Sequence, residues 1–507
     1  NDIHNFFFEM GDVCSIPVYD TFFEKRLVDG YIMSRRKHDE ILPSADESEL
    51  VENAGGYVAD AIDGTKDNLG VSDLKSLYPS AIITWNISTE TVAETPEDFD
   101  EYVKIPKVPE PKDVDGDILQ KSIDYDWLYA SLDEEGLIPS VIKKLFPERE
   151  ARKAKRNQFD PEDELYGVWD RKQAAVKVIM NSFYGVMSND YWRLGEHGLG
   201  DAVTSAARYA LWQGKEIGVE EGYEIYYGDT DSIMLSLADP DEGKEVALDR
   251  GKELEETVNS RMDRCVRASG MPEGVEHPHL LDSLHGTDRH ALVYEFEKLY
   301  RRFFQAGSKK RYAGRFVWKE GKDIDGDIDM VGFESNRSDS PELTSEIQPE
   351  VVNRILSGQG FAEISEYVVD LIDQIESREM DLYKVAIPKS IGKKLDSYGN
   401  TQTAKACRFS NKHLDTEWTK GDDPWLYYVS STPAMHPGTS VIALDWDQDI
   451  PEGYELDMDK ILDRACKGPL RPILREVEWR WTEVKQGAKT QSAAGDWSSD
   501  WSDDEEE

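Results

Sequence analysis

The stretch YYGDTDSIML, residues 226–235, places Asp229 and Asp231 one residue apart between two short apolar runs. Apolar and aromatic residues on both sides of a polar break predict a β-hairpin with the two aspartates at its tip. Aspartate suits a tight turn because its side chain bonds the nearby backbone. The same carboxylates could instead form a metal site, since Mg²⁺ takes one or two carboxylates together with substrate phosphates. The hairpin alone leaves both interpretations open.

A further carboxylate comes from the region around residue 73. The segment NLGVSD (68–73) predicts a strand that ends at Asp73, and Pro79 in the following LKSLYPS (74–80) fits the start of a helix. Taken alone, Asp73 would be a turn residue or a helix N-cap. Carboxylates at the ends of two neighbouring strands could also hold two metal ions about 4 Å apart.

Basic residues gather between the two acidic motifs. Residues 141–157 carry seven Lys and Arg against two acids, and residues 162–185 predict a second long helix that stops at Gly185. The simplest arrangement is two antiparallel helices joined by a short turn. Polar side chains at helical spacing follow each helix: Arg149 and Lys153 on the first, and Gln173, Lys177, Asn181 and Tyr184 on the second. Such a stripe is usually a solvated face, but facing cations also suit a triphosphate.

The rest of the chain predicts mixed structure. Residues 88–136 hold 15 acids and four lysines and are expected to form a loop-rich surface insertion. Patterns predict a helix over 246–268, strands over 291–318 and helices over 343–380. Mixed structure is expected to about residue 485, followed by a disordered acidic tail.

The charge of the chain is strongly acidic. Its 507 residues include 59 Lys and Arg against 102 Asp and Glu, a net charge of −43. An acidic surface could repel nucleic acid and bind basic partners. Acids spread along the whole length instead favour a surface adapted to concentrated salt, where charges are screened within about 3 Å. Residues 298–316 oppose the trend, with seven Lys and Arg and no acid.

Cellular location is constrained by three features. The four cysteines are far apart and form no CxxC pair, which favours a reducing interior over a zinc site. No apolar run approaches the roughly 18–20 residues of a membrane span, so we expect no membrane association and a cytoplasmic location, in a high-salt cytoplasm. The first residue is Asn1, which suggests a fragment or a processed product.

Five motifs in order carry a resemblance to a known family. DLKSLYPSAI (73–82), KVIMNSFYG (177–185) and YGDTDS (227–232) resemble motifs A, B and C of family B DNA polymerases. SKKRYAG (308–314) is similar to that family's lysine–tyrosine motif, and GFESNRSDSPE (332–342) to the beginning of its thumb. The chain looks most like the archaeal replicative members, from a haloarchaeon or a virus of such a host.

The resemblance implies an α+β fold of the right-hand polymerase type. It would have a palm with an antiparallel sheet, two-helix fingers and a mostly helical thumb. The expected divisions are a linker and the first part of the palm at 1–139, the fingers at 140–186, the second part of the palm at 187–325, the thumb at 326–485, and the disordered tail at 486–507.

The resemblance also assigns roles to individual residues. The implied catalytic residues are Asp73, Asp229, Asp231 and Lys177, and the implied ligands of two Mg²⁺ ions are Asp73, Asp231 and the Leu74 carbonyl. The implied nucleotide-binding residues are Leu77, Tyr78, Arg149, Lys153, Lys177 and Asn181, with Tyr78 as a steric gate against ribonucleotides. The implied DNA-binding residues are Gly55, Gly56, Lys309, Lys310, Tyr312 and Arg337.

The implied function is template-directed addition of deoxynucleotides to a primer 3′-OH. The expected partners are primer–template DNA, deoxynucleoside triphosphates and, through QSAAGDW (491–497), a sliding clamp. No Asp-x-Glu exonuclease motif precedes Asp73, so proofreading would need a separate exonuclease-bearing polypeptide. Asn53 before the glycine pair and RSD at 337–339 depart from the family pattern. The alternatives are a protein-primed polymerase of the same family and an inactive polymerase-like DNA-binding subunit.

Overall fold

The structure, a computed structural model, describes residues 64–97, 99–106, 127–160, 162–188, 197–268, 290–306, 309–324 and 326–487. These residues divide into two compact units, one of residues 70–298 and one of residues 64–69 and 299–487. Strands β1 (Thr65–Leu74) and β7 (Tyr294–Gln305) each pass from one unit to the other. Among the described residues, no helix combines the length and hydropathy that a membrane span requires. Of the expected disordered tail at 486–507, residues 488–507 lie outside these ranges, and Gln486 is the last residue of a helix.

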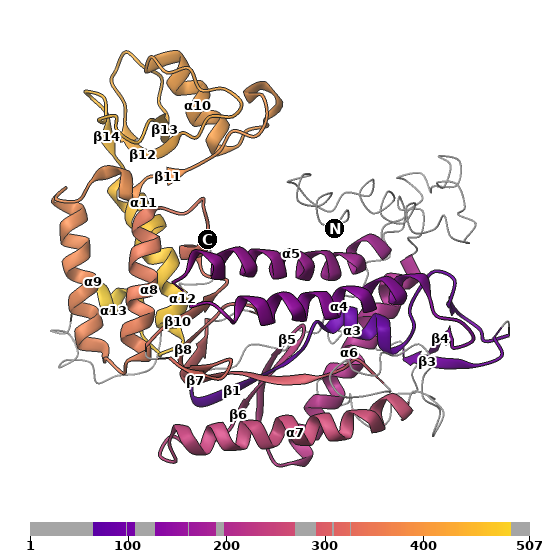
Figure 1. Cartoon of the computed structure of the whole chain (residues 1–507). Coiled ribbons are helices and arrows are strands. Elements are labelled where there is room, and N and C mark those ends of the chain that lie inside the picture. Colours follow the sequence, from indigo (N-terminus) through magenta and orange to yellow (C-terminus); the bar gives the residue numbers. More distant parts are fainter. Residues whose placement is uncertain are drawn as a thin grey trace. The chain divides into compact units, whose positions relative to one another are not determined.

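The first unit combines helices with two sheets (Figure 1). Within it, the main sheet has the strand order β5-β6-β1-β7, and a smaller sheet has the order β2-β4-β3. Its remaining elements are α3 (Leu77–Thr84), β2 (Val92–Ala93), β3 (Tyr102–Pro106), β4 (Trp127–Ser131), α4 (Leu137–Arg156), α5 (Glu164–Met187), α6 (His197–Glu220), β5 (Ile225–Asp229), β6 (Ser232–Ser236) and α7 (Lys244–Ala268). The mixed α and β character expected from the sequence is confirmed.

The hairpin predicted from YYGDTDSIML is confirmed. Strands β5 and β6 pair antiparallel, with Asp229 opposite Ser232 at the turn. Tyr227 and Ile233 are buried, so the apolar runs on both sides of the turn face the interior. Close packing extends to β1, where a Cβ added to Gly70 would come within 2.2 Å of Leu237 Cδ1. A larger residue there would force Leu237 to shift, so glycine favours the close packing of β1 in the sheet.

Helix α4 begins on a set of side-chain caps. The first N–H groups of a helix lack partners within the helix. Here the Asn86 side chain accepts from Gly136 N–H at 2.9 Å, Glu90 accepts from Leu137 N–H, and Ser88 accepts from Ile138 N–H at 3.3 Å. Further along, the helix contains Pro147, which lacks the N–H that would bond the preceding turn.

Helix α5 packs against α4, and the two run side by side as predicted (Figure 1). Asp163 caps its first turn by accepting from Leu165 N–H at 2.8 Å. The predicted end at Gly185 is wrong, because the helix continues to Met187 and ends at Ser188. Glycine stops a helix only where the backbone turns left-handed, and Gly185 keeps helical geometry.

The insertion at residues 88–136 is more ordered than expected. In its described parts, β3 pairs with β4 from Tyr102 opposite Ser131 to Pro106 opposite Trp127, and β2 joins the other edge of β4. Val103 and Ile105 are fully buried. The high acid content concealed this short alternating apolar pattern, so the prediction missed three strands, whereas the other described residues of the segment form no helix or strand.

The second unit contains a sheet in the order β1-β7-β8-β10, with β9 pairing β8, and a further sheet of β11 to β14. Its elements are β8 (Tyr312–Lys319), β9 (Lys322–Asp323), β10 (Ile328–Val331), α8 (Glu342–Leu356), α9 (Phe361–Glu376), β11 (Ile387–Pro388), α10 (Gln402–His413), β12 (Trp425–Ser431), β13 (Val441–Leu444), β14 (Glu455–Leu456), α11 (Met458–Leu462), α12 (Gly468–Arg475) and α13 (Trp481–Gln486). The predictions of a helix at 246–268, strands at 291–318 and helices at 343–380 are confirmed by α7, by β7 and β8, and by α8 and α9.

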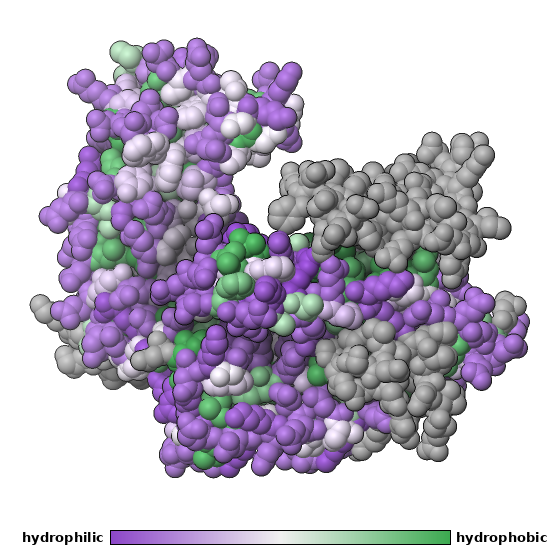
Figure 2. All heavy atoms as spheres, in the orientation of Figure 1, coloured by the Kyte–Doolittle hydropathy of each residue, from purple (hydrophilic) through white to green (hydrophobic). Residues whose placement is uncertain are grey.

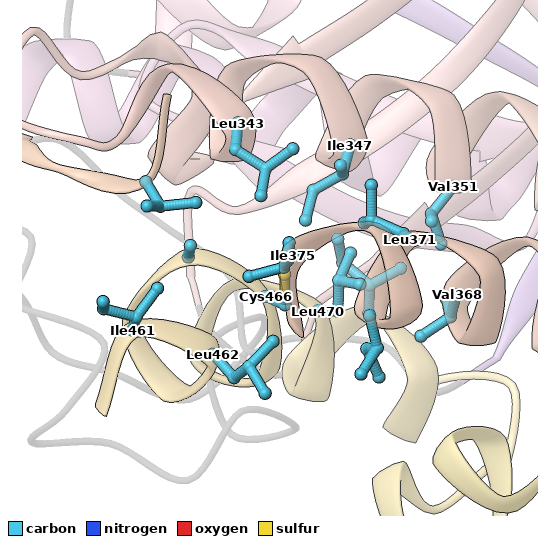
Figure 3. Packing of buried hydrophobic residues seen from close by; sticks show 14 of the residues in the cluster. Leu343, Ile347, Val351, Val368, Leu371, Ile375, Ile461, Leu462, Cys466 and Leu470 are labelled. Carbon is cyan, nitrogen blue, oxygen red and sulfur yellow. The ribbon is translucent and has the colours of Figure 1, made fainter. Parts of the chain in front are cut away.

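The core of the second unit lies between helices far apart in sequence. Leu343, Ile347 and Val351 of α8 face apolar residues of α9 and of the C-terminal helices (Figure 3). Cys466 is buried in the same cluster as a free thiol. The molecular face shown in Figure 2 is mostly hydrophilic, with apolar residues in small groups, as the high acid content predicts.

Truncating this core should destabilise the second unit. Ile347 is 1% exposed, so Ile347→Ala removes buried methyl groups and leaves a cavity that costs about 2–5 kcal/mol of unfolding free energy. Urea denaturation measures the loss. Met435→Ala is the matched control, because Met435 is 82% exposed and its truncation should change stability by less than about 0.5 kcal/mol. Equal effects of the two substitutions would contradict the assigned core.

Candidate active site

The two motif aspartates meet at the ends of adjacent strands. Asp73 is the penultimate residue of β1, and Asp231 lies in the turn between β5 and β6. Leu74 N–H donates to the Asp231 carbonyl at 2.7 Å, which fixes the end of β1 beside the turn. Lys75 N–H donates to the Val293 carbonyl of the segment leading into β7 at 2.9 Å, so β1 is held on both sides. The predicted proximity of Asp73 and Asp231 is therefore observed.

The turn that presents Asp231 is tight and strained. Asp231 N–H donates to the Asp229 carbonyl at 2.6 Å across Thr230, whose φ is 61°. A β-branched residue is rarely found in this left-handed region, and such strain is kept where the surrounding structure imposes it. The Thr230 hydroxyl also donates to Asp229 Oδ1 at 3.1 Å. The Asp229 carbonyl therefore closes the turn, and the Thr230 hydroxyl orients the Asp229 side chain.

Burial makes the two carboxylates electrostatically costly. Burial raises the pKa of Asp73 well above its ordinary value, and the charges of Asp231 and Glu297 raise it further. The pKa of Asp231 is also raised, first by burial and then by Asp229. Lys177 acts in the opposite direction and lowers the pKa of both groups. Buried carboxylates with too little compensating charge are the donors that a hard divalent cation prefers.

The structure supplies few further side-chain ligands. Within the described ranges, no three His, Cys, Asp or Glu side chains gather closely enough to hold a metal ion by themselves. Mg²⁺ commonly takes one or two carboxylates and completes its coordination with water and substrate phosphates. Asp73 and Asp231 are thus suitable ligands for a cation that a phosphate-bearing substrate shares.

Glu297 is a site residue that the sequence prediction missed. It lies on β7 beside β1, and its charge raises the pKa of both Asp73 and Asp231. It pairs with Lys298, whose Nζ lies 3.4 Å from Glu297 Oε2. The only signal in the sequence was the alternation of YEFEKLY (294–300), and pairing of this strand with β1 could not be read from it.

Helices α4 and α5 bring cations into the same unit. Arg149 is only 7% exposed, and it donates to Ser76 Oγ at 3.3 Å and to Gln173 Oε1 at 3.4 Å. The pKa of Lys153 is lowered by burial and by the neighbouring charge of Arg149. Lys177 is exposed and interacts electrostatically with both motif aspartates. Lys177 thus acts on the aspartates directly, whereas Arg149 contacts Ser76 and Lys153 interacts with Lys75, and the grouping of all three cations around a nucleotide stays a prediction.

Two of the residues predicted to bind the nucleotide differ in their exposure to solvent. Leu77 is buried in the first turn of α3. Asn181 is exposed on α5, one turn beyond Lys177, and no described contact joins it to the carboxylates. The structure thus leaves the role of Asn181 as a prediction.

Tyr78 is held against a second aromatic ring. Its centroid lies 4.7 Å from that of Tyr184 on α5, with the ring planes inclined by 33°. Burial raises the pKa of Tyr78 to about 12, with smaller contributions from Tyr184 and Asp231. Arg208 on α6 lowers this pKa and is itself buried, donating to Ser205 Oγ at 3.0 Å. Sequence reasoning did not identify Arg208, because α6 carries none of the quoted motifs.

The predicted DNA contacts fall in the second unit or outside the described residues. Gly55 and Gly56 are outside. Lys309 and Lys310 are exposed, whereas Tyr312 is only 8% exposed and packs its ring 5.4 Å from Phe303. Tyr312 therefore exposes little surface for a DNA contact.

Other basic residues of the second unit are already paired. Arg337 is 64% exposed, and its guanidinium bonds Asp339 at 3.0 Å. Asp339 also accepts from Lys389 Nζ at 2.7 Å, and these two cations lower the pKa of Asp339 to about 2. Arg311 is bound to Glu334, which also accepts from Gln348 at 2.7 Å. Arg311 therefore serves an internal network.

Comparison with known proteins gives the class of this chain. A family model described as DNA polymerase family B matches residues 15–266 and 287–463. The match covers most of the chain and includes all three motifs around Asp73, Lys177 and Asp231. The chain belongs to DNA polymerase family B.

The individual relatives are only 26–28% identical to this chain, and they are longer proteins. A DNA polymerase of Archaeoglobus fulgidus is 28% identical over 399 residues, which are 78% of this chain and 43% of that protein. A DNA polymerase of Pyrococcus glycovorans is 28% identical over 485 residues, which are 92% of this chain and 54% of that protein. The DNA polymerase delta catalytic subunit of Glycine max is 26% identical and is covered to 33%. The chain thus spans about half or less of the length of these relatives.

A solved structure shares the fold. The family B DNA polymerase from the hyperthermophilic archaeon Pyrobaculum calidifontis superimposes with a TM-score of 0.55 and 24% sequence identity. The similarity covers 86% of this chain and 48% of that one. At this identity the comparison supports the fold, while the chemistry has to be argued from the residues.

The raised carboxylate pKa values predict a stability change. An unfolded aspartate ionises near pH 3.8, but the folded Asp73 ionises at higher pH, so the folded chain loses stability as pH rises between these values. Asp73→Asn should therefore raise the melting temperature of metal-free chain at pH 8, on the order of 2–4 °C. The gain should vanish near pH 4. The control is exposed Asp241→Asn, and a gain independent of pH would contradict the explanation.

Proposed function

We propose that this chain is the polymerising portion of a template-directed DNA polymerase, which adds deoxynucleotides to a primer 3′-OH. The observation that carries the proposal is the half-buried pair Asp73 and Asp231 on adjacent strand ends, with Lys177 acting electrostatically on both. Family membership supports it, since the named relatives are DNA polymerases. Phosphoryl transfer depends mostly on positioning and charge neutralisation, which this arrangement can supply.

The finer architecture follows from this proposal. The sheet that bears Asp73 and Asp231 would be the palm, and α4 and α5 would be the fingers. Residues 326–485, with α8 and α9 at their start, would form the thumb. The proposed partners are primer–template DNA and deoxynucleoside triphosphates, with DNA contacts from Lys309, Lys310 and Arg337.

Asp73 and Asp231 would hold two Mg²⁺ ions, with the Leu74 carbonyl as a further ligand. Bound Mg²⁺ supplies Lewis-acid activation and neutralisation of phosphate charge in such sites. Asp229 keeps the turn in place through its carbonyl and its bond from Thr230. Glu297 adds negative charge beside the pair, which strengthens cation binding.

The cations would bind the triphosphate. Arg149 is oriented by Ser76 and Gln173, so its guanidinium is positioned before the substrate arrives. Lys153 lies one turn further along α4 and would contact the same phosphate groups. Lys177 is exposed and close enough to the aspartates to share their field, which suits it to donate a proton to departing pyrophosphate.

The proposal is tested by primer extension on a primed template with Mg²⁺ and deoxynucleotides. Asp231→Asn preserves shape but removes the metal-binding charge, so incorporation should fall by on the order of 10³-fold. Duplex binding, followed by fluorescence anisotropy, should be nearly unchanged because Asp231 is assigned to metal. Asp241→Asn removes one negative charge from an exposed site and serves as the control. Full activity of Asp231→Asn would overturn the metal assignment.

Tyr78 would discriminate against ribonucleotides by occupying the space of a 2′-OH. Its contact with Tyr184 fixes the ring, so the exclusion does not depend on a hydrogen bond. Tyr78→Ala should raise the ratio of ribonucleotide to deoxynucleotide kcat/KM by about tenfold or more. Tyr78→Phe keeps the ring and should retain the original ratio. The assignment fails if the alanine variant discriminates as well as the parent chain.

A further inference from the structure

Glu150 places a carboxylate among the cations assigned above to the triphosphate. It follows Arg149 on α4, and its Oε1 lies 3.7 Å from Lys153 Nζ and 3.8 Å from Lys75 Nζ. This oxygen is buried and, within the described ranges, accepts no hydrogen bond. Its interaction with the two ammonium groups is therefore one of charge at ion-pair distance, without a directed bond.

Lys75 has a second and closer acidic partner. Its Nζ lies 3.0 Å from Glu295 Oε1 on β7, compared with 3.8 Å from Glu150. Lys75 is largely buried, with its side chain 13% exposed, and sits in the link between β1 and α3. If Glu150 moves away, Lys75 stays neutralised by Glu295, while Lys153 loses its ion pair and one of the two acidic groups that act on it. The contacts of Glu150 are therefore the ones that can be exchanged.

We propose that Glu150 is an internal counter-ion of the triphosphate site, paired with Lys153 and Lys75 until an incoming polyphosphate displaces it. The inference rests on the proposed function, which assigns Arg149 and Lys153 to phosphate, and it adds a residue that sets nucleotide affinity. Glu150 leaves the phosphate site as the substrate enters. It therefore affects which phosphate compounds bind, because each must displace it. The exchange also releases the ion pair between α4 and the loop after β1.

Displacement has a definite kinetic signature. In the free chain this carboxylate is paired with the cations, and both the substrate and the transition state must displace it. It therefore weakens the binding of both equally. Loss of Glu150 should therefore lower KM for the nucleotide and leave kcat unchanged. A more highly charged polyphosphate competes better with Glu150 than a monophosphate does, so the carboxylate also favours triphosphates over shorter products.

The direct test is binding of inorganic tripolyphosphate to the full chain, with Mg²⁺, by titration calorimetry. Glu150→Gln keeps the side-chain shape without its charge, and binding should tighten about fivefold, as expected for loss of a partly exposed ion pair. Glu148→Gln is the matched control. Glu148 lies on the same helix and pairs with Arg152 at 3.1 Å. Its replacement changes net charge equally and should leave affinity within about twofold.

Unchanged or weaker binding by Glu150→Gln, or an equal gain in both variants, would overturn the inference. A thermal melt verifies folding, and Glu150→Ala, which carries the same expectation, replaces Glu150→Gln if the latter fails to fold. Primer extension by the parent chain reports separately on the proposed function. If Glu150→Gln binds tripolyphosphate more tightly but the parent chain does not extend a primer, Glu150 remains the counter-ion and the proposed polymerase function is refuted. Absence of tripolyphosphate binding to every variant would refute the counter-ion even in an active polymerase.

Discussion

The site depends on one backbone hydrogen bond, from Leu74 N–H to the carbonyl of Asp231. This bond sets the register between the end of β1 and the hairpin turn, and so it brings two like charges together in a half-buried position. Burial and mutual repulsion raise the pKa of Asp73, which means that the folded chain bears a cost in the absence of a cation. A divalent ion would turn that cost into binding affinity.

Charge compensation comes from helices that are separate in sequence from the strands. Lys177 lowers the pKa of both aspartates from α5, and Arg149 approaches from α4 through its bonds to Ser76 and Gln173. Glu297 acts against this compensation. The site is thus balanced between excess negative charge, which favours metal, and a group of cations, which favours phosphate. A substrate that carries both metal and phosphate satisfies the two halves at once.

The sequence predicted those parts of the site that local patterns encode. The hairpin around Asp231, the strand end at Asp73 and the two helices with Arg149 and Lys177 could be predicted from periodicity, turn residues and motif order. Glu297 and Arg208 could not, because their proximity to the site depends on strand pairing and helix packing across long sequence separations. Local signals also misplaced the end of α5, since Gly185 stays helical when tertiary packing continues the helix.

Pro147 has a mechanical consequence for the phosphate-binding residues. The first turn of α4 is fixed by caps from Asn86, Ser88 and Glu90, whereas Pro147 removes a backbone bond further along. Arg149 and Lys153 lie beyond this weakened turn. Lys153 is six residues past it, a lever arm of about 9 Å at 1.5 Å per residue. A tilt of about 10° there would displace its backbone by roughly 1.5 Å, so the position of Lys153 is more sensitive to the missing bond than the capped base of the helix is.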